Sequence, residues 1–374
     1  MSKTKVINDL QVFFLFLAYV GITCHVIILP AILGVAQRDS WVSVLIGGVI
    51  FLALIISGIY FIMKQTKQEN LYTWLKENTH PVVYWLVTIL FLLNLLIGIY
   101  ISFYDTIRWT NTAYLPGTPS WIIALFTIVV CAFCAYLGLE TLVIASGLLV
   151  PIVILLGVFV MSGNIPMKDY SLLFPIMQHG FPPIWKGIIY AFSGWMEFIA
   201  ILFFQQNLKN KINRKTLWIT GSVLIMITLG PVIGSITEFG PITSSQLRYP
   251  AYEQWRLLTL GPLVEHVDFL SIYQWWVGSF IRISLELYLI LAILQINKKK
   301  TRVWVLSAIV LVIFCSMKIP IGDSPFWSIT ANYFLPLSLL LTSFIFLFLL
   351  LICVWNKYRN NSRNGKHEEN TTKT

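Results

Sequence analysis

Residues 10–36 read LQVFFLFLAYVGITCHVIILPAILGVA, a run without a single Asp, Glu, Lys or Arg. A helix needs about 20 predominantly apolar residues to cross the hydrocarbon of a bilayer, and this run is long enough to do so. A second apolar run follows at residues 40–63. Because the first run has no convincing small-residue cleavage site and leads directly into the second, we expect a retained membrane helix rather than a signal peptide.

The composition of the whole chain shows that these two runs are typical of it. Of its 374 residues, 57% are apolar and 11% are Asp, Glu, Lys or Arg, whereas a soluble domain carries about a quarter of charged residues. A soluble core cannot hide so much apolar surface, and disordered chains are poor in aromatic residues. The sequence therefore predicts an all-α polytopic membrane protein with ten transmembrane helices. The runs lie at about residues 10–36, 40–63, 81–104, 119–137, 141–162, 184–206, 216–239, 264–296, 303–318 and 325–356.

The distribution of positive charge predicts the orientation of the chain. Ten spans place both termini on one side, and 18 of the 26 Lys and Arg residues fall in the segments on that side, against seven on the other. Because cytoplasmic loops collect basic residues, both termini are expected to be cytoplasmic. The net charge of +10 then belongs to these loops, and no nucleic acid partner is expected. Residues 1–356 are predicted to form one membrane domain, and residues 357–374 a disordered cytoplasmic tail.

Two connections between the spans are long enough to carry structure of their own. Residues 240–263 contain three prolines around an amphipathic stretch and can fold over a site as a lid. Residues 67–79 place Leu71, Trp74 and Leu75 among charged residues, a pattern typical of an interfacial helix.

The span count also predicts two structural halves. Residues 10–162 and 184–356 each hold five spans, and an odd number of spans inverts the second half relative to the first. Inverted repeats are common in secondary transporters, whose sites lie where interrupted helices meet. The first span of each half has interruption signals, in Gly21-Ile22-Thr23-Cys24-His25 and in Ser193-Gly194-Trp195-Met196-Glu197. Broken helices 1 and 6 would expose backbone groups to a cavity, although Gly in a membrane helix also serves close packing.

Ionisable residues within spans need a reason, because a charge at the bilayer centre costs at least about 2.5–3.5 kcal/mol. Glu197 lies in the middle of span six and is interpreted as a proton carrier, a ligand for an ammonium group or a gate, with a protonated, hydrogen-bonded carboxyl as the alternative. Arg282 and Glu286 are four residues apart in span eight and are predicted to pair, as a structural clamp or as a coupling pair.

Signals for enzymatic chemistry are missing from the sequence. It holds no phosphate-binding loop, no nucleophile elbow and no zinc-binding helix motif, so we expect no catalytic residue, no cofactor and no metal. Cys131 and Cys134 have the spacing of a metal or redox pair without a second pair or a His cluster. Buried small apolar residues are the better interpretation.

Several stretches of the chain resemble one known family. They are FLSIYQW at residues 269–275 with FIRIS at 280–284, DYSLLFP at 169–175, and the Gly-x-x-Glu at 194–197. From about residue 10 to 358 the chain resembles the spore germination permease-like proteins, the B subunits of endospore germinant receptors. These belong to the amino acid–polyamine–organocation superfamily. Two departures from the family stand out. Glu265 is followed by His266 where the family often has Arg. Thr23, Cys24 and His25 occupy the break in span one, where many relatives have small residues.

The resemblance implies a LeuT-like fold of five plus five helices in the inner membrane of the spore. It implies three kinds of partner besides membrane lipid: a larger membrane A subunit, a lipoprotein C subunit and a small-molecule nutrient germinant. A small zwitterion is expected to bind between the breaks in spans one and six, with a small neutral amino acid preferred over a nucleoside or a sugar. The expected ligand-binding residues are Gly21, Thr23, Cys24, His25, Tyr100, Phe192, Ser193, Gly194 and Glu197.

A fold of this type serves receptors and transporters alike. Proton-coupled members of the superfamily often place a Lys in span five, and sodium-coupled members place adjacent hydroxyl residues in span eight. Residues 141–160 contain no Lys or Arg, and Ser279 and Ser284 are not adjacent. The sequence therefore favours a germinant-binding receptor subunit, with an ion-coupled amino-acid transporter as the alternative.

Overall fold

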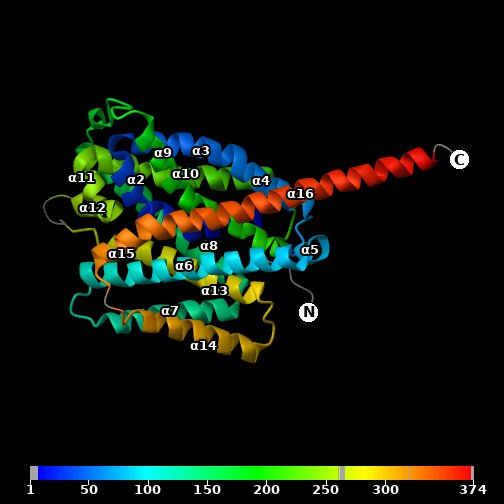
Figure 1. The fold of residues 1–374 in the computed structure, drawn as a ribbon. Coiled ribbons are helices and arrows are strands. Elements are labelled where there is room, and N and C mark those ends of the chain that lie inside the picture. Colours follow the sequence, from blue (N-terminus) through cyan, green and yellow to red (C-terminus); the bar gives the residue numbers. More distant parts are fainter. Residues whose placement is uncertain (1–6, 260, 262–265, 320, 372–374) are drawn as a thin grey trace.

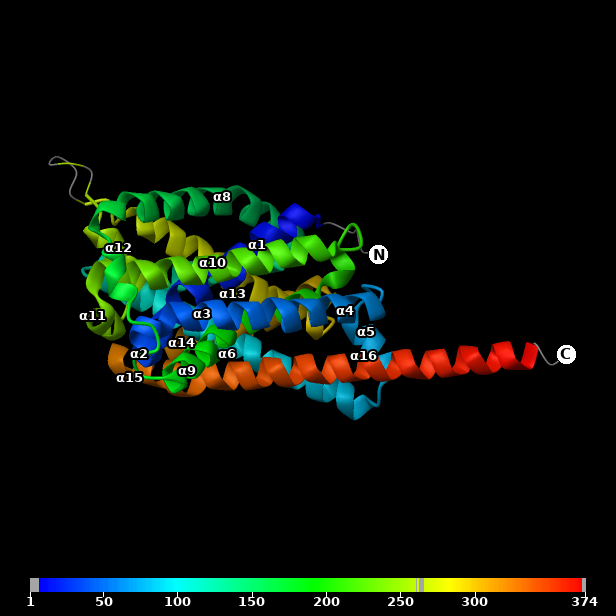
Figure 2. The ribbon, with the colours of Figure 1, turned by 90° about the horizontal axis from the view of Figure 1, so that it is seen from above.

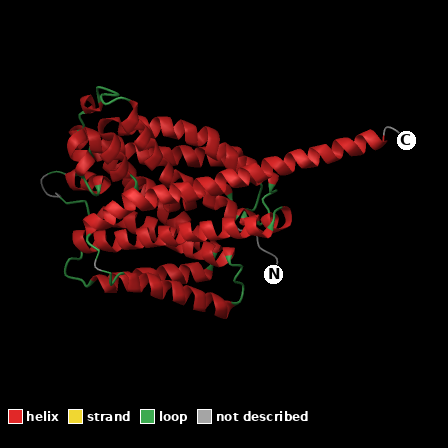
Figure 3. Ribbon diagram, in the orientation of Figure 1, coloured by secondary structure: helices red, strands yellow, loops and turns green. Residues whose placement is uncertain are grey.

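The computed structural model describes the chain except for residues 1–6, 260, 262–265, 320 and 372–374. Glu265 thus lies outside the described residues. The described chain is built from helices that run side by side, with loops gathered at the two ends of the bundle (Figures 1 and 3). The first helix begins and the last one ends at the same end, here called the terminal end, and the opposite end is called the lid end.

The opening segment folds into two antiparallel arms. Helix α1 (Asp9–Ile22) begins at a capping box in which the side chains of Asn8 and Gln11 each accept a backbone N–H of the other residue. A π-turn, η1 (Thr23–Ile27), and α2 (Leu29–Ala36) complete the first arm. The chain reverses at η2 (Gln37–Asp39), where Gln37 has a positive φ. The return arm comprises α3 (Ser40–Ile50), η3 (Phe51–Ile56) and α4 (Ser57–Gln65) (Figure 2).

Eight described segments are long and apolar enough to cross a membrane, whereas the sequence predicts ten spans. The difference has two causes. The two arms form one continuous candidate, Asp9–Gln65, and α14 (Lys299–Ser316) begins with three basic residues within its 18 residues. The other candidates are α6 (Pro81–Ala113), α7 (Ser120–Leu137), α8 (Leu139–Gly163), α9 (Phe181–Trp195) with η6 (Met196–Phe203), α10 (Arg214–Phe239), α13 (Leu270–Ile293), and Asp323–Arg359, which joins α15 (Asp323–Ile329), η8 (Thr330–Phe334) and α16 (Leu335–Thr371).

The predicted breaks are changes of helix type rather than extended gaps. At η1 the helix widens, and the N–H of Ile28 donates to the carbonyl of Thr23 over 2.9 Å. At η6 the helix tightens into a 3₁₀ form over eight residues. Runs of 3₁₀ helix longer than three or four residues are uncommon, and π-turns occur frequently at functional sites. The two irregular stretches also lie where the two helices approach each other, because Thr23 of η1 and Glu197 of η6 are hydrogen-bonded.

Helix α13 occupies the middle of the bundle and packs against α1, α6, α7 and α8. Its neighbours on the outside of the bundle, α7 and α8, expose large apolar side chains such as Phe133 and Leu155, as expected for surfaces that face lipid. Helix α5 (Leu71–Asn78), predicted to be interfacial, buries Leu71, Trp74 and Leu75 against protein.

Short helices cover the lid end. They are α11 (Pro241–Gln246) and α12 (Pro250–Leu257), preceded in the chain by η4 (Ile165–Met167) and η5 (Tyr170–Leu173). Residues 240–259, which hold α11 and α12, are called the lid below (Figure 1). At the terminal end, α16 continues through residues 357–371, where the sequence predicts a disordered tail.

Candidate functional site

A buried ion pair joins α13 to the irregular turn η6. The guanidinium of Arg282 donates to both carboxylate oxygens of Glu197, with Nη2 2.9 Å from Oε1. Arg282 is 4% exposed and Glu197 6%. A bidentate pair of this kind is stronger and more directional than a single contact. The Glu197 carboxylate is thus paired with Arg282 in this structure. The sequence did not indicate this pairing.

The π-turn supplies a third member to this pair. The Thr23 hydroxyl accepts a hydrogen bond from Arg282 Nη1 over 2.6 Å and donates to Glu197 Oε2 over 2.9 Å. From α6, Ser102 Oγ accepts from Arg282 Nε over 2.6 Å. The Arg282 guanidinium also lies 5.4 Å from the ring centre of Tyr19. Four separate elements therefore meet at one guanidinium.

A second carboxylate lies beside the pair. Glu286 Oε1 is 3.3 Å from Arg282 Nη2, as the four-residue spacing predicts, and Glu286 is 1% exposed. Its Oε2 makes no hydrogen bond with any described residue. Gly98 on α6 makes room for it, because a Cβ at that position would lie 2.4 Å from Glu286 Oε1. The site network, as it is called below, consists of Thr23, Ser102, Glu197, Arg282 and Glu286.

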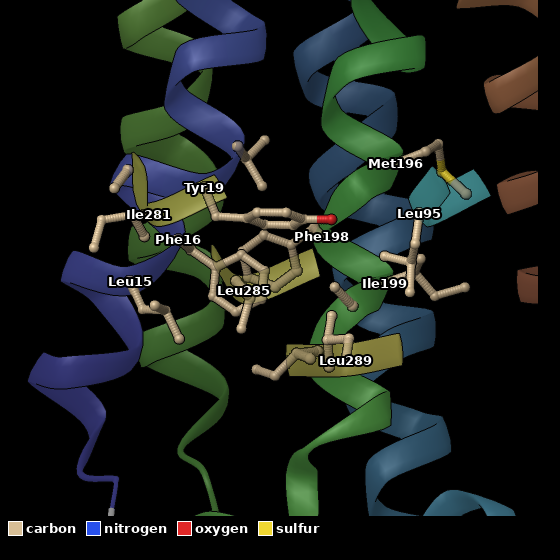
Figure 4. Close-up of a cluster of buried hydrophobic side chains, with 14 of the residues drawn as sticks. Leu15, Phe16, Tyr19, Leu95, Met196, Phe198, Ile199, Ile281, Leu285 and Leu289 are labelled. Atoms are coloured by element: carbon tan, nitrogen blue, oxygen red, sulfur yellow. The ribbon is translucent and has the colours of Figure 1, made fainter. Parts of the chain in front are cut away.

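Apolar side chains close the network on its terminal side. Phe16 packs against Phe198 with ring centroids 4.5 Å apart, and against Tyr19 at 6.0 Å. Leu285 and Leu289 of α13 fill the same region (Figure 4). All five side chains are fully or almost fully buried, so they form a packed apolar layer on this side of the network.

Aromatic side chains close the network on its lid side. Trp109 of α6 stacks on Trp275 of α13 with centroids 3.9 Å apart and planes within 9°. These rings pack over Ile22 and Val26 of the first arm. The aromatic cover, as it is called below, comprises Trp109, Tyr114, Tyr249, Tyr252 and Trp275.

The remaining predicted site residues fall into two groups. Gly194 adjoins the network, because a Cβ there would lie 3.3 Å from Thr23 Cγ2 and 3.0 Å from Ile28 Cδ1. A Cβ at Gly21 would meet no atom within 4 Å, so that position borders open space.

The side chains of the others make no hydrogen bond to the network among the described residues. Cys24 and His25 belong to the π-turn η1, which packs against α10, and the Ser193 hydroxyl donates to the carbonyl of Tyr190. Phe192 packs edge-on against Phe51 and Trp195. Tyr100 packs against Tyr104, Phe326 and Phe334.

Sequence reasoning missed Gly98, Ser102 and Tyr19. Gly98 and Ser102 are four residues apart and so lie on one face of α6. Small residues with this spacing let helices approach closely in membranes, and this signal was available in the sequence. Among the described residues, no group of three His, Cys, Asp or Glu side chains is arranged to hold a metal ion.

Comparison with known proteins places the chain among spore proteins. The sequence model of the family described as spore germination protein matches residues 6–323. Spore germination protein XB of Bacillus anthracis is 39% identical over 350 residues, which cover 93% of this chain and 98% of that protein. Spore germination protein YndE of Bacillus subtilis is 22% identical over 272 residues, covering 70% and 73%.

A solved structure shares the fold. The crystal structure of MhsT in complex with L-phenylalanine superposes with a TM-score of 0.57, covering 88% of this chain and 87% of that chain. Because the identity is 11%, this likeness concerns the fold alone.

Proposed function

This chain belongs to the spore germination protein family, whose members are membrane proteins without enzymatic activity, and from that premise we propose that it is the nutrient-binding B subunit of a germinant receptor. It would sense a small neutral amino acid or a similar nutrient and signal to its partner subunits. The membrane A subunit and the lipoprotein C subunit are the proposed partners.

The Arg282–Glu197 pair is the observation that carries this proposal. It presents one positive and one negative group, both buried, between η6 and α13. A zwitterionic amino acid carries the same two charges and can exchange with the pair, its carboxylate on Arg282 and its ammonium on Glu197. The carbonyls near residues 192–194 can add acceptors for the ammonium. A buried pair tolerates such an exchange because no charge is left without a partner.

Exchange with the pair offers a route from binding to signal. A ligand controls a conformational equilibrium only through different contacts in the two states. The pair holds η6 against α13, and Thr23 links both to the π-turn η1. If a ligand separates the pair, the first arm would therefore shift, together with the helices that contact the partner subunits.

The membrane arrangement belongs to the same proposal. We place the protein in the inner membrane of the spore with both termini in the cytoplasm, which makes the lid end the outer side. The two arms of Asp9–Gln65 and helix α14 supply the crossings needed for ten spans. Residues 10–162 and 184–356 would then form the inverted repeats of a LeuT-type fold, and the similarity to MhsT supports this.

Deletion of the gene tests the proposal directly. Spores without it would be challenged with amino acids, nucleosides and sugars, and the loss of refractility recorded. Loss of response to one defined nutrient, with growth and uptake unchanged, is the expected result. Normal germination combined with impaired uptake of one compound by growing cells would instead establish the ion-coupled transporter. The Glu286 oxygen that makes no hydrogen bond with any described residue is the feature that favours this alternative.

Replacement of Gly194 by leucine is expected to abolish the response to nutrient while the protein still accumulates. The new side chain would enter the space between Ile28 and Thr23, where even a Cβ lies within 3.0–3.3 Å of its neighbours. The measurement is a germination dose–response, with the amount of protein in spore membranes determined by immunoblot.

Gly147 on α8 offers a matched control, because its Cβ would meet no atom within 4 Å. Gly147→Leu should leave the dose–response unchanged. An ordinary dose–response in Gly194→Leu spores would remove Gly194 from the proposed binding region.

A further inference from the structure

One arginine connects the lid to two membrane helices. Arg248 lies between α11 and α12, and its guanidinium pairs with the carboxylate of Asp105 on α6. Its Nε lies 3.5 Å from Asp323 Oδ2 at the start of α15. The Asp105 side chain is 5% exposed and that of Arg248 19%, so solvent screens the contact only partly.

Two aromatic rings hold the same guanidinium. Its carbon lies 4.3 Å from the ring centre of Tyr249 and 4.5 Å from that of Trp327 on α15, within the range of a cation–π interaction. The Tyr249 hydroxyl also donates to Asp105 over 3.3 Å. Burial and the nearby Asp105 carboxylate raise the pKa of Tyr249 above its ordinary value, so the hydroxyl stays protonated and can donate.

These contacts are continuous with the aromatic cover, because Tyr249 belongs to both. Tyr249 packs edge-on against Trp275 at 5.2 Å, and Trp275 stacks on Trp109. Beneath the two tryptophans lie Ile22 and Val26, on either side of Thr23 of the site network. Movement of Arg248 away from α6 would therefore pull Tyr249 away from the other members of the cover.

An ordinary surface ion pair on the same lid provides the contrast. Arg256 pairs with Glu253 within one helix, three residues apart, and its side chain is 58% exposed. Such pairs contribute little, and this one joins no separate elements. Arg248 instead joins the lid to α6 through the buried carboxylate of Asp105, and to α15 through the partly buried ring of Trp327 and the exposed carboxylate of Asp323.

We propose that Arg248 is a positioning residue that latches the lid over the site network, so that a ligand enters from the lid end only after Arg248 leaves Asp105. The proposal rests on the proposed function in treating the site network as the place where nutrient binds. The latch itself is a property of this chain and can be measured without nutrient or germination.

Thiol labelling measures the latch. The five native cysteines are replaced by alanine in the full chain, and Val26→Cys places a reporter beneath the cover. In reconstituted protein, Arg248→Gln is expected to raise the rate of modification by a membrane-impermeant thiol reagent by about tenfold or more, because a charge-assisted contact is lost. Asp105→Asn should raise the rate similarly. The double variant should add little to the rate of Arg248→Gln, since both changes break the same Arg248–Asp105 pair.

Two controls make the outcome decisive. Arg256→Gln removes a charge from the same lid and should leave the rate unchanged. A reporter at Leu15, which is about one helical turn closer than Tyr19 to the start of α1 at the terminal end, should show no acceleration with Arg248→Gln. Equal rates in Arg248→Gln and wild type, or acceleration at both reporters, would overturn the latch.

A second measurement avoids the cysteine replacements. Hydrogen–deuterium exchange of residues 241–257 in the native chain should become faster with Arg248→Gln and not with Arg256→Gln. Unchanged exchange in Arg248→Gln would also overturn the proposal. Because neither readout uses germination, a failure of the latch is distinguishable from a failure of the proposed function.

Discussion

Replacement of Arg282 by alanine is expected to reduce the amount of protein in spore membranes several-fold and to abolish the germination response. The substitution leaves two buried carboxylates, Glu197 and Glu286, without their cation. Removing one partner of a buried pair costs about 3–5 kcal/mol, a large part of the roughly 5–15 kcal/mol that stabilises a typical protein. Immunoblots of spore membranes and thermal unfolding in detergent measure the effect.

Two companion variants test the reason for this loss. Glu286→Gln is expected to reduce the protein level only slightly. Glu286 makes one contact of 3.3 Å with Arg282, and the glutamine amide has the same shape as the carboxyl group it replaces. The double variant Glu197→Ala with Arg282→Ala removes both charges of the bidentate pair and should recover part of the protein level. Wild-type accumulation of Arg282→Ala would contradict the structural role of the pair. Equal losses in Arg282→Ala and Glu286→Gln would contradict its assignment to Glu197.

Replacement of Gly98 by alanine is expected to destabilise the protein by about 1–3 kcal/mol, the usual cost of overpacking a core. The added Cβ would lie 2.4 Å from Glu286 Oε1 and 3.0 Å from Arg282 Nη2. Alanine favours a helix over glycine by about 1 kcal/mol, so the sign of the result decides whether packing or propensity dominates. Thermal unfolding of purified protein gives the answer.

Gly21 provides the comparison for this measurement. It is also buried, but a Cβ there would meet no atom within 4 Å. Gly21→Ala should therefore leave the unfolding temperature unchanged or raise it slightly. A Gly98→Ala protein as stable as Gly21→Ala would show that Glu286 does not need the space that Gly98 provides.

The sequence identified most members of the site network but not their partnership. Glu197, Arg282 and Glu286 stood out because charges within apolar spans need a reason, and Thr23 because it followed a glycine within the first span. The i, i+4 spacing correctly placed Glu286 near Arg282. It could not show that Arg282 makes its closer, bidentate contact with Glu197, 85 residues away.

The expected pocket was less accurate in its backbone and its aromatic residues. The breaks at the first and sixth spans are π and 3₁₀ turns, so fewer backbone groups are free than an unwound helix would offer. Tyr100 and Phe192 contact other aromatic rings instead of the network. The periodicity of one helix shows which residues share a face, but not which other helix packs against that face. The contacts of Tyr100 and Phe192 depend on that neighbouring helix.

By itself, the sequence determined that this protein is an all-helical membrane protein and that it resembles the spore germination family. Hydrophobic run length and charge distribution are local properties, and the bilayer acts on each span separately. Only the tertiary structure decided that Arg282 joins Glu197, that Gly98 makes room for Glu286, and that Arg248 ties the lid to α6 and α15. These contacts join residues far apart in the chain, so they depend on how the helices pack, which no local pattern specifies.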